Sequence, residues 1–202
     1  MAVPETQLTL IARLRDPKDE AAWLRFEGRY RELVVRFSMR QGLQAADAED
    51  VAQAVFSSLL SAMRNFTFDP SKGRFRDYLF RAVRNEINRQ KSKARRPLGH
   101  SPVLTMGDLG PAADPSTADG TDAEKAFEDE WIDHHFRLAL QEIRRTHSPE
   151  SVAIFERLMA GQTVETTAIA FATTEQAVHK IKQRIRDRMQ ELIQAQIAEE
   201  GG

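Results

Sequence analysis

Residues 75–85 of this 202-residue chain read FRDYLFRAVRN, and their pattern decides the fold that we expect. Apolar residues recur there at spacings of three and four, which predicts that they share one face of an α-helix; they are Phe75, Tyr78, Leu79, Ala82 and Val83. The arginines and asparagines of residues 76–89 fall outside that face. Cationic side chains contact phosphates, and aromatic and amide groups stack on or bond unpaired bases. The stretch therefore indicates a helix with one face in a core and the other against nucleic acid.

The composition limits the classes of protein to which the chain can belong. With 41% hydrophobic and 29% charged residues, it can form one large domain or two small ones. It contains no cysteine, so disulfides and thiolate metal sites are excluded. No apolar run approaches the ~20 residues that span a membrane, and residues 1–9 lack the pattern of a secretory signal. We therefore expect a soluble, cytoplasmic protein.

The net charge of −1 hides two segments of opposite charge. Residues 72–96 hold ten cations against two acids, a balance of +8, whereas residues 108–133 hold nine acids against one cation, a balance of −8. Local fields of this kind decide which surfaces can approach DNA. We hypothesise that the acidic segment repels DNA or covers a basic face.

Proline and glycine divide the chain into parts. Residues 97–120 contain eight of these residues and show no helical or strand periodicity, which predicts a flexible linker. Residues 1–96 and 121–198 have helical spacing, and no stretch alternates as a strand does. We expect an all-α protein of two small helical domains joined by this linker, the second containing a helix-turn-helix.

Local signals predict where several helices begin. Asp47 is expected to cap one helix, and Thr121 and Glu124 have the spacing of a capping box at the start of another. Ser148 precedes a proline suited to a first helical turn. Thr174 is expected to cap a long last helix, whose inner face would be formed by Val178, Ile181, Ile185 and Met189.

The pattern at residues 75–85, Phe-(Arg/Lys)-x-aromatic-Leu-aromatic-x-x-x-Arg-Asn, resembles the DNA-melting segment of bacterial RNA polymerase sigma factors, in particular the small extracytoplasmic-function (ECF) group. Residues 47–56 are similar to that family's polymerase-binding helix, and residues 164–189 look like its promoter-reading helix-turn-helix. The resemblance covers most of the chain. It implies transcription initiation at specific promoters, with core RNA polymerase, promoter DNA and an inhibitor protein as partners.

For polymerase binding, the resemblance implies that one helix face contacts the coiled-coil clamp of the polymerase β′ subunit. The implied residues are Asp47, Glu49, Asp50, Gln53 and Phe56. The residues expected to face inward are Val51, Val55, Leu59 and Leu60. Ala54 departs from the family, which usually has glutamate there. An amphipathic helix with an acidic first turn is the alternative interpretation of this stretch.

For the promoter −10 element, the resemblance implies that the loop at residues 66–73 and the following helix hold a base flipped out of the DNA. Flipping costs a few kcal/mol of stacking, so aromatic walls and amide donors are needed to offset it. Phe66, Phe68, Asn85 and Asn88 are candidates, and spacing does not decide among them. The implied −10 contacts are Phe66, Phe68, Lys72, Arg74, Arg81, Asn85, Asn88, Arg89, Arg95 and Arg96. The alternative is an aromatic core stripe with a solvated basic face.

For the −35 element, the resemblance implies a recognition helix in the C-terminal domain, which would also dock on the polymerase β flap. Its implied contacts are Thr174, Glu175, Gln176, His179, Lys180, Gln183 and Arg184, of types that suit base edges and phosphates in a major groove. The turn before this helix usually carries a glycine, and here Phe171-Ala172-Thr173 fills it. A plain helical hairpin is the alternative.

No pattern indicates catalysis. The chain has neither a metal-protease motif nor a phosphate-binding loop nor a nucleophile elbow, so we expect no enzyme activity, no metal and no cofactor.

The expected function is that of an ECF-type sigma factor. Two alternatives stay open: a helix-turn-helix regulator that binds DNA without polymerase, and a sigma-like module whose task is to be captured by a signalling or inhibitor protein.

Overall fold

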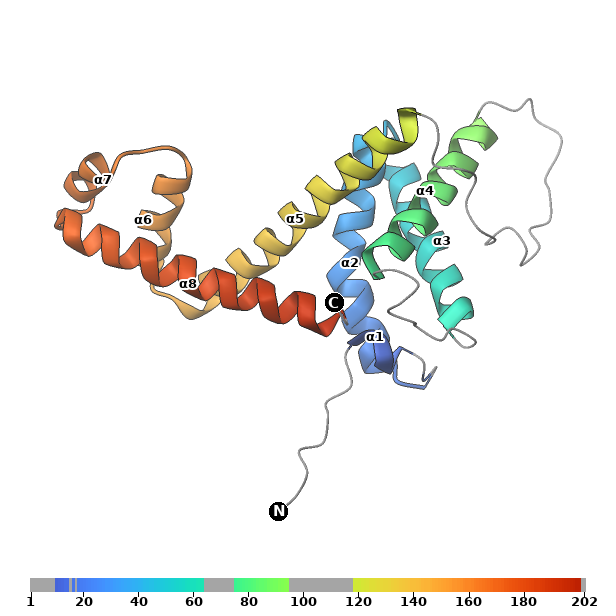
Figure 1. Cartoon of the computed structure of the whole chain (residues 1–202), viewed down its shortest axis with the longest axis horizontal. Helices are drawn as coiled ribbons and strands as arrows, with labels where there is room; N and C mark the ends of the chain where they lie inside the picture. Colours follow the sequence, from blue (N-terminus) through green and yellow to red (C-terminus); the bar gives the residue numbers. More distant parts are fainter. Residues whose placement is uncertain (1–9, 15, 17, 64–74, 95–117, 201–202) are drawn as a thin grey trace, which may run out of the picture. The chain divides into compact units, whose positions relative to one another are not determined.

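The computed structural model of the chain describes residues 10–14, 16, 18–63, 75–94 and 118–200. These residues form eight helices and no strand, which confirms the prediction of an all-α fold (Figure 1). They are α1 (Leu10–Arg13), α2 (Glu20–Arg40), α3 (Ala45–Met63), α4 (Phe75–Ala94), α5 (Ala118–Thr146), α6 (Pro149–Met159), α7 (Val164–Ala170) and α8 (Glu175–Glu199). None of the helices in these ranges is long and apolar enough to cross a membrane.

The chain divides into two compact units. Unit 1 comprises residues 1–132 and 199–202, and unit 2 comprises residues 133–198. The expected loop at residues 66–73 and most of the expected linker lie outside the described residues, although residues 118–120 of that linker are helical. The assignment of polymerase and −10 functions to residues 1–96 and of −35 function to residues 121–198 stays a prediction.

An aromatic cluster forms the core of unit 1. The apolar residues of α2, α3 and α4 face one another at the helical spacings that the sequence predicted. The first part of α5 adds two aromatic residues, Phe127 and Trp131. The Phe127 ring centroid lies 5.0 Å from that of Phe37 and 5.2 Å from that of Phe80, and Trp131 stacks on Tyr30 at 5.7 Å. Because the apolar face of α4 is buried in this cluster, its opposite face is left at the surface.

Two of the predicted helix starts are wrong. Helix α3 begins at Ala45, so Asp47 lies in its first turn instead of at the cap. Helix α5 begins at Ala118, so Thr121 lies inside the helix and caps nothing at its start. A carboxylate in a first turn still interacts favourably with the helix dipole, so the acidic character of the α3 start is kept although the capping role is not.

The helix starts predicted in unit 2 are confirmed. Ser148 Oγ accepts a hydrogen bond from the Ser151 N–H at the start of α6, with Pro149 in the first turn. Thr174 Oγ1 accepts one from the Ala177 N–H, 3.2 Å away, at the start of α8. The inner face of α8 is also confirmed, since Val178, Ile185 and Met189 are buried and Ile181 packs against both cores of unit 2.

Candidate polymerase and promoter interface

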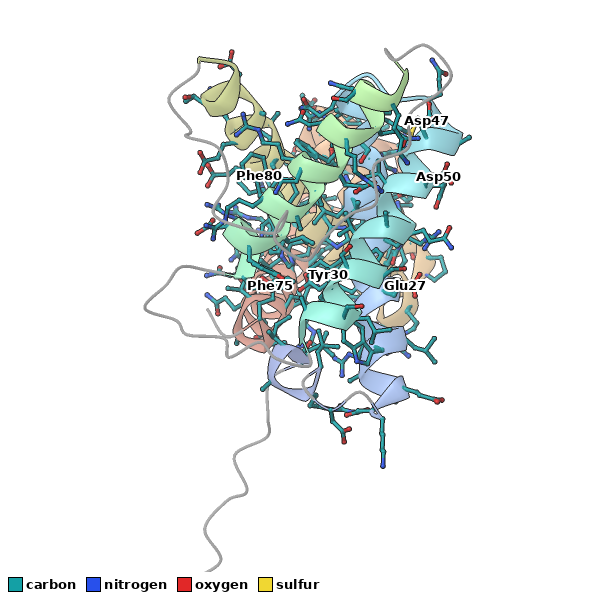
Figure 2. All side chains as sticks on the ribbon, turned by 90° about the vertical axis from the view of Figure 1, so that its right-hand side faces the viewer. Glu27, Tyr30, Asp47, Asp50, Phe75 and Phe80 are labelled. Carbon is teal, nitrogen blue, oxygen red and sulfur yellow. The ribbon has the colours of Figure 1, made fainter. Side chains whose placement is uncertain are left out.

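The acidic surface of α3 is where the sequence predicted it. Asp50 and Gln53 are exposed and Asp47 is half-buried, and Figure 2 shows Asp47 and Asp50 on the outer side of the helix. The three line a groove of about 910 Å³ together with the last turns of α4. There the Gln90 side-chain amide donates to Asp47 Oδ1 over 3.2 Å. Arg89, Lys91 and Lys93 of α4 line the same groove, so its charge is mixed, and the acidic side chains of α3 form only one of its walls.

The other two residues implied in polymerase binding are placed differently. Glu49 Oε2 accepts a hydrogen bond from Arg31 Nη2 at 2.9 Å, and the same guanidinium contacts Glu27 at 2.7 Å. The negative charge of Glu49 is thus partly balanced by Arg31 within the chain. Phe56 is buried, with its ring centroid 5.7 Å from that of Phe26. Phe56 therefore belongs to the core, and it also lines a surface groove with residues of α2.

One expectation about α3 is wrong. Leu60 was expected to face inward with Leu59, but its side chain is 39% exposed while Leu59 is 2% exposed. Successive residues of an α-helix point about 100° apart, so only one of two adjacent leucines can point directly into this core. Leu60 is instead part of the surface of unit 1.

The exposed strip of α4 is formed by three of the residues implied in −10 recognition. Arg81, Asn85 and Asn88 follow one another at spacings of four and three, and all are exposed. The opposite face, with Leu79, Val83 and Ile87, is buried. The strip thus offers one cation and two amides, held by a rigid helix, to phosphates and base edges.

Arg89 does not belong to that strip. It lies near the groove beside α3, where its Nε donates to Glu86 Oε2 at 2.8 Å. This bond raises the pKa of Arg89 against the opposing effect of partial burial. The spacing of Asn85, Asn88 and Arg89 alone could not separate the two faces, because Arg89 is only one residue beyond Asn88.

The acidic segment contacts the other side of α4. Arg76 Nη1 donates to Glu128 Oε1 at 2.8 Å, one helical turn from the contact between Phe80 and Phe127. Only part of the acidic segment lies in the described residues, and there it pairs with Arg76 of α4.

Six of the residues implied in −10 recognition fall outside the described residues: Phe66, Phe68, Lys72, Arg74, Arg95 and Arg96.

Helices α7 and α8 form the predicted helix-turn-helix pair in unit 2 (Figure 1). All seven residues implied in −35 recognition are exposed: Thr174, Glu175, Gln176, His179, Lys180, Gln183 and Arg184. Thr174 is the helix cap, so its hydroxyl oxygen is already engaged with the backbone. Gln183 donates to Asp187 Oδ1 at 2.7 Å, and Arg184 Nη2 donates to Ser151 Oγ at 3.3 Å.

A shallow hollow of about 560 Å³ lies beside this strip. It is lined by residues of α8 of both charges, and by His147 from the junction of α5 and α6; the α8 residues are Lys180, Gln183, Arg184, Asp187, Arg188 and Glu191. Sequence reasoning did not single out His147, because a residue between two helices has no periodicity that shows which way it faces. Among the described residues, no cluster of three or more histidine and acidic side chains could hold a metal ion.

Comparison with known proteins agrees with the character of unit 1. The family model of sigma-70 region 2 matches residues 28–97, a span that contains most of α2 and all of α3 and α4. Comparison with curated proteins and with solved structures finds no match. Sigma factors are not enzymes, which confirms the prediction of a non-enzymatic protein. The chain therefore carries a sigma-70 region 2 domain, which implies a sigma factor that binds core RNA polymerase and the promoter −10 element.

Proposed function

We propose that the chain is an ECF-type sigma factor. In this proposal α3 binds the β′ clamp of core RNA polymerase, α4 opens and reads the −10 element, and the α7–α8 pair reads the −35 element while unit 2 docks on the β flap. The observation that carries the proposal is the exposed strip of Arg81, Asn85 and Asn88, since it lies on a helix inside the sigma-70 region 2 match.

The chemistry of this strip suits a melted −10 element. An unpaired base offers its Watson–Crick edge to hydrogen-bonding side chains, and an asparagine amide has both a donor and an acceptor for it. Arg81 can neutralise a neighbouring phosphate. Because the opposite face of α4 is fixed in the aromatic core, the three side chains are presented without the cost of ordering a loop.

The chemistry of α8 suits a duplex −35 element. His179, Lys180, Gln183 and Arg184 project from a helix whose other face is buried, as a recognition helix in a major groove requires. The bonds of Gln183 to Asp187 and of Arg184 to Ser151 hold two of these side chains in place before DNA arrives. An inhibitor protein that covers either DNA-binding surface is a further partner in this proposal.

The test of polymerase binding is a pull-down with core RNA polymerase. Reversing two charges, Asp47→Lys with Asp50→Lys, should abolish co-purification, because both carboxylates lie on the α3 surface and Glu49 is already balanced by Arg31. Asp47 lies in the first turn of α3 and contributes only ~0.3–1 kcal/mol to helix stability, and Asp50 is exposed, so the fold should persist. The matched control reverses two exposed acids of unit 2, Glu150→Lys with Glu165→Lys. Equal co-purification of both double variants would contradict the assignment of the clamp-binding face.

A further inference from the structure

Arg76 of α4 is a cation that an acidic side chain of α5 holds. Its Nη1 donates to Glu128 Oε1 at 2.8 Å, and its Nε donates to the neighbouring Asp77 at 3.2 Å. The Arg76 side chain is 23% exposed, whereas that of Glu128 is 52% exposed. Residues 118–132 belong to unit 1, so the pair with Glu128 lies within one compact unit. The more accessible partner of this pair is therefore the carboxylate.

Aromatic packing fixes the backbone on both sides of this ion pair. The residue before Glu128 is Phe127, which is buried and packs on Phe80 of α4 with 5.2 Å between ring centroids. One turn later in α5, the Trp131 ring lies 6.4 Å from that of Phe75. Phe75 and Phe80 flank the arginine in α4. The carboxylate is thus brought to the guanidinium by the core of unit 1.

Arg76 borders the exposed strip of α4. Successive residues of a helix turn by about 100° and rise by about 1.5 Å, so Arg81 lies about 140° around α4 from Arg76 and about 7.5 Å along it. Arg84 is half-buried and lies between the two around the helix. A nucleic-acid strand carries a charge every ~3.4 Å. A strand that crosses α4 from the strip of Arg81, Asn85 and Asn88 can therefore place a phosphate near Arg76.

Glu128 offers Arg76 the kind of group that a phosphate would offer. A guanidinium binds carboxylate and phosphate oxygens with the same planar set of N–H donors. The surrounding segment, residues 108–133, has a charge balance of −8, which is of the sign of nucleic acid. Because the Glu128 side chain is more than half exposed, it can turn away from Arg76 while Phe127 stays packed in the core.

We propose that Arg76 is a nucleic-acid-binding residue and that Glu128 occupies it, in the place of a phosphate, until DNA displaces the carboxylate. Glu128 is then an intramolecular competitor that lowers the affinity of the free chain for DNA. A surface ion pair shifts an equilibrium by up to about fivefold, so the competition is modest and reversible. This proposal rests on the proposed function, because it adds a phosphate contact to the helix that we assign to the −10 element.

The experiment measures the affinity of the full-length chain for a fluorescent single-stranded DNA of mixed sequence over a series of salt concentrations. Glu128→Gln removes the charge and keeps the shape, so binding should tighten by about two- to fivefold at low salt. The slope of log affinity against log salt should steepen by ~0.7, the value for one further phosphate contact on a single strand. The control is Asp129→Asn, which removes the same charge from the next residue, also exposed, and should leave both quantities near those of wild type.

Arg76→Ala identifies the residue through which Glu128 acts. In a chain that carries Arg76→Ala, the further change Glu128→Gln should no longer tighten binding. A gain that persists in this background, or an equal gain in Asp129→Asn, would overturn the proposal, because the acidic charge would then act at long range. Thermal melts of each variant check that the core of unit 1 is intact.

Co-purification with core RNA polymerase tests the proposed function separately. If wild-type protein binds core polymerase while Glu128→Gln binds the DNA probe no better than wild type does, the masking of Arg76 alone is overturned. If wild-type protein does not bind core polymerase, the proposed function fails and this proposal with it.

Discussion

Ala172 lies in the turn between α7 and α8, at a position where glycine is usual. Its φ of 48° lies in the left-handed region, and the described part of the chain has no other non-glycine residue there. The turn ends α7 with two hydrogen bonds, from Ala172 N–H to the Ile169 carbonyl and from Thr173 N–H to the Ala168 carbonyl. Gly161 ends α6 with the same pair of bonds at a φ of 87°. The turn between α7 and α8 thus forms without the usual glycine.

This conformation gives a prediction about stability. Ala172→Gly should raise the free energy of unfolding of unit 2 by about 0.5–1 kcal/mol, because relief of left-handed strain outweighs the extra freedom of glycine in the unfolded chain. The matched change Gly161→Ala should lower it by about 1 kcal/mol, and no atom lies near enough to its new Cβ to add a clash. Thermal melts of both variants check this, and a loss of stability in Ala172→Gly would contradict it.

Asn85 and Arg81 should have separable effects on the −10 element. Asn85→Ala should reduce discrimination at one base by ~1–3 kcal/mol, because an amide contacts a particular base edge. Arg81→Ala should weaken all sequences alike and reduce the salt dependence, because a phosphate contact carries no sequence information. Binding of the polymerase complex to a set of single-base −10 variants measures both effects. A uniform loss across the set in Asn85→Ala would remove Asn85 from base recognition.

At the scale of helices, periodicity predicts which residues of a helix face the core. It does not predict which residues from distant parts of the chain contact one another. The apolar stripes of α2, α4 and α8 needed only a spacing of three and four to be recognised. The pairing of Glu49 with Arg31 joins residues 18 apart in sequence, and no local pattern contains it. The role of α5 was missed for the same reason. The capping-box spacing at Thr121 predicts a start three residues too late, and nothing local shows that Phe127 and Trp131 join a core formed by helices far earlier in the chain.

The first part of α5 should therefore be needed for the stability of unit 1. Trp131 is 6% exposed and packs on Tyr30 and Phe127, so Trp131→Ala should cost ~3–5 kcal/mol. Its neighbour Ile132 is 61% exposed, and Ile132→Ala should change stability by less than about 0.5 kcal/mol. Denaturant unfolding followed by a probe in unit 1 distinguishes the two. Equal effects of the two substitutions would mean that α5 does not complete this core.

At the scale of the whole molecule, the net charge of −1 does not show that the surfaces of individual helices differ in charge. The exposed strip of α4 is basic and amide-bearing, the outer face of α3 is acidic, and α8 carries cations on its exposed strip. A protein of this kind binds DNA at particular surfaces and not through an overall attraction. The sigma-70 region 2 match accounts for α3 and α4 together, whereas the role of unit 2 rests on the shape and side chains of α7 and α8.

The most direct test of the account is transcription by core RNA polymerase from a library randomised at the −10 and −35 positions, with and without the chain. We predict that the chain directs transcription from a subset that shares one motif at each element. Asn85→Ala should alter the −10 motif alone, and Gln183→Ala should alter the −35 motif alone. The contradicting result is a set of transcripts identical to that of core polymerase without the chain, or selection of the same sequences by the chain when polymerase is absent.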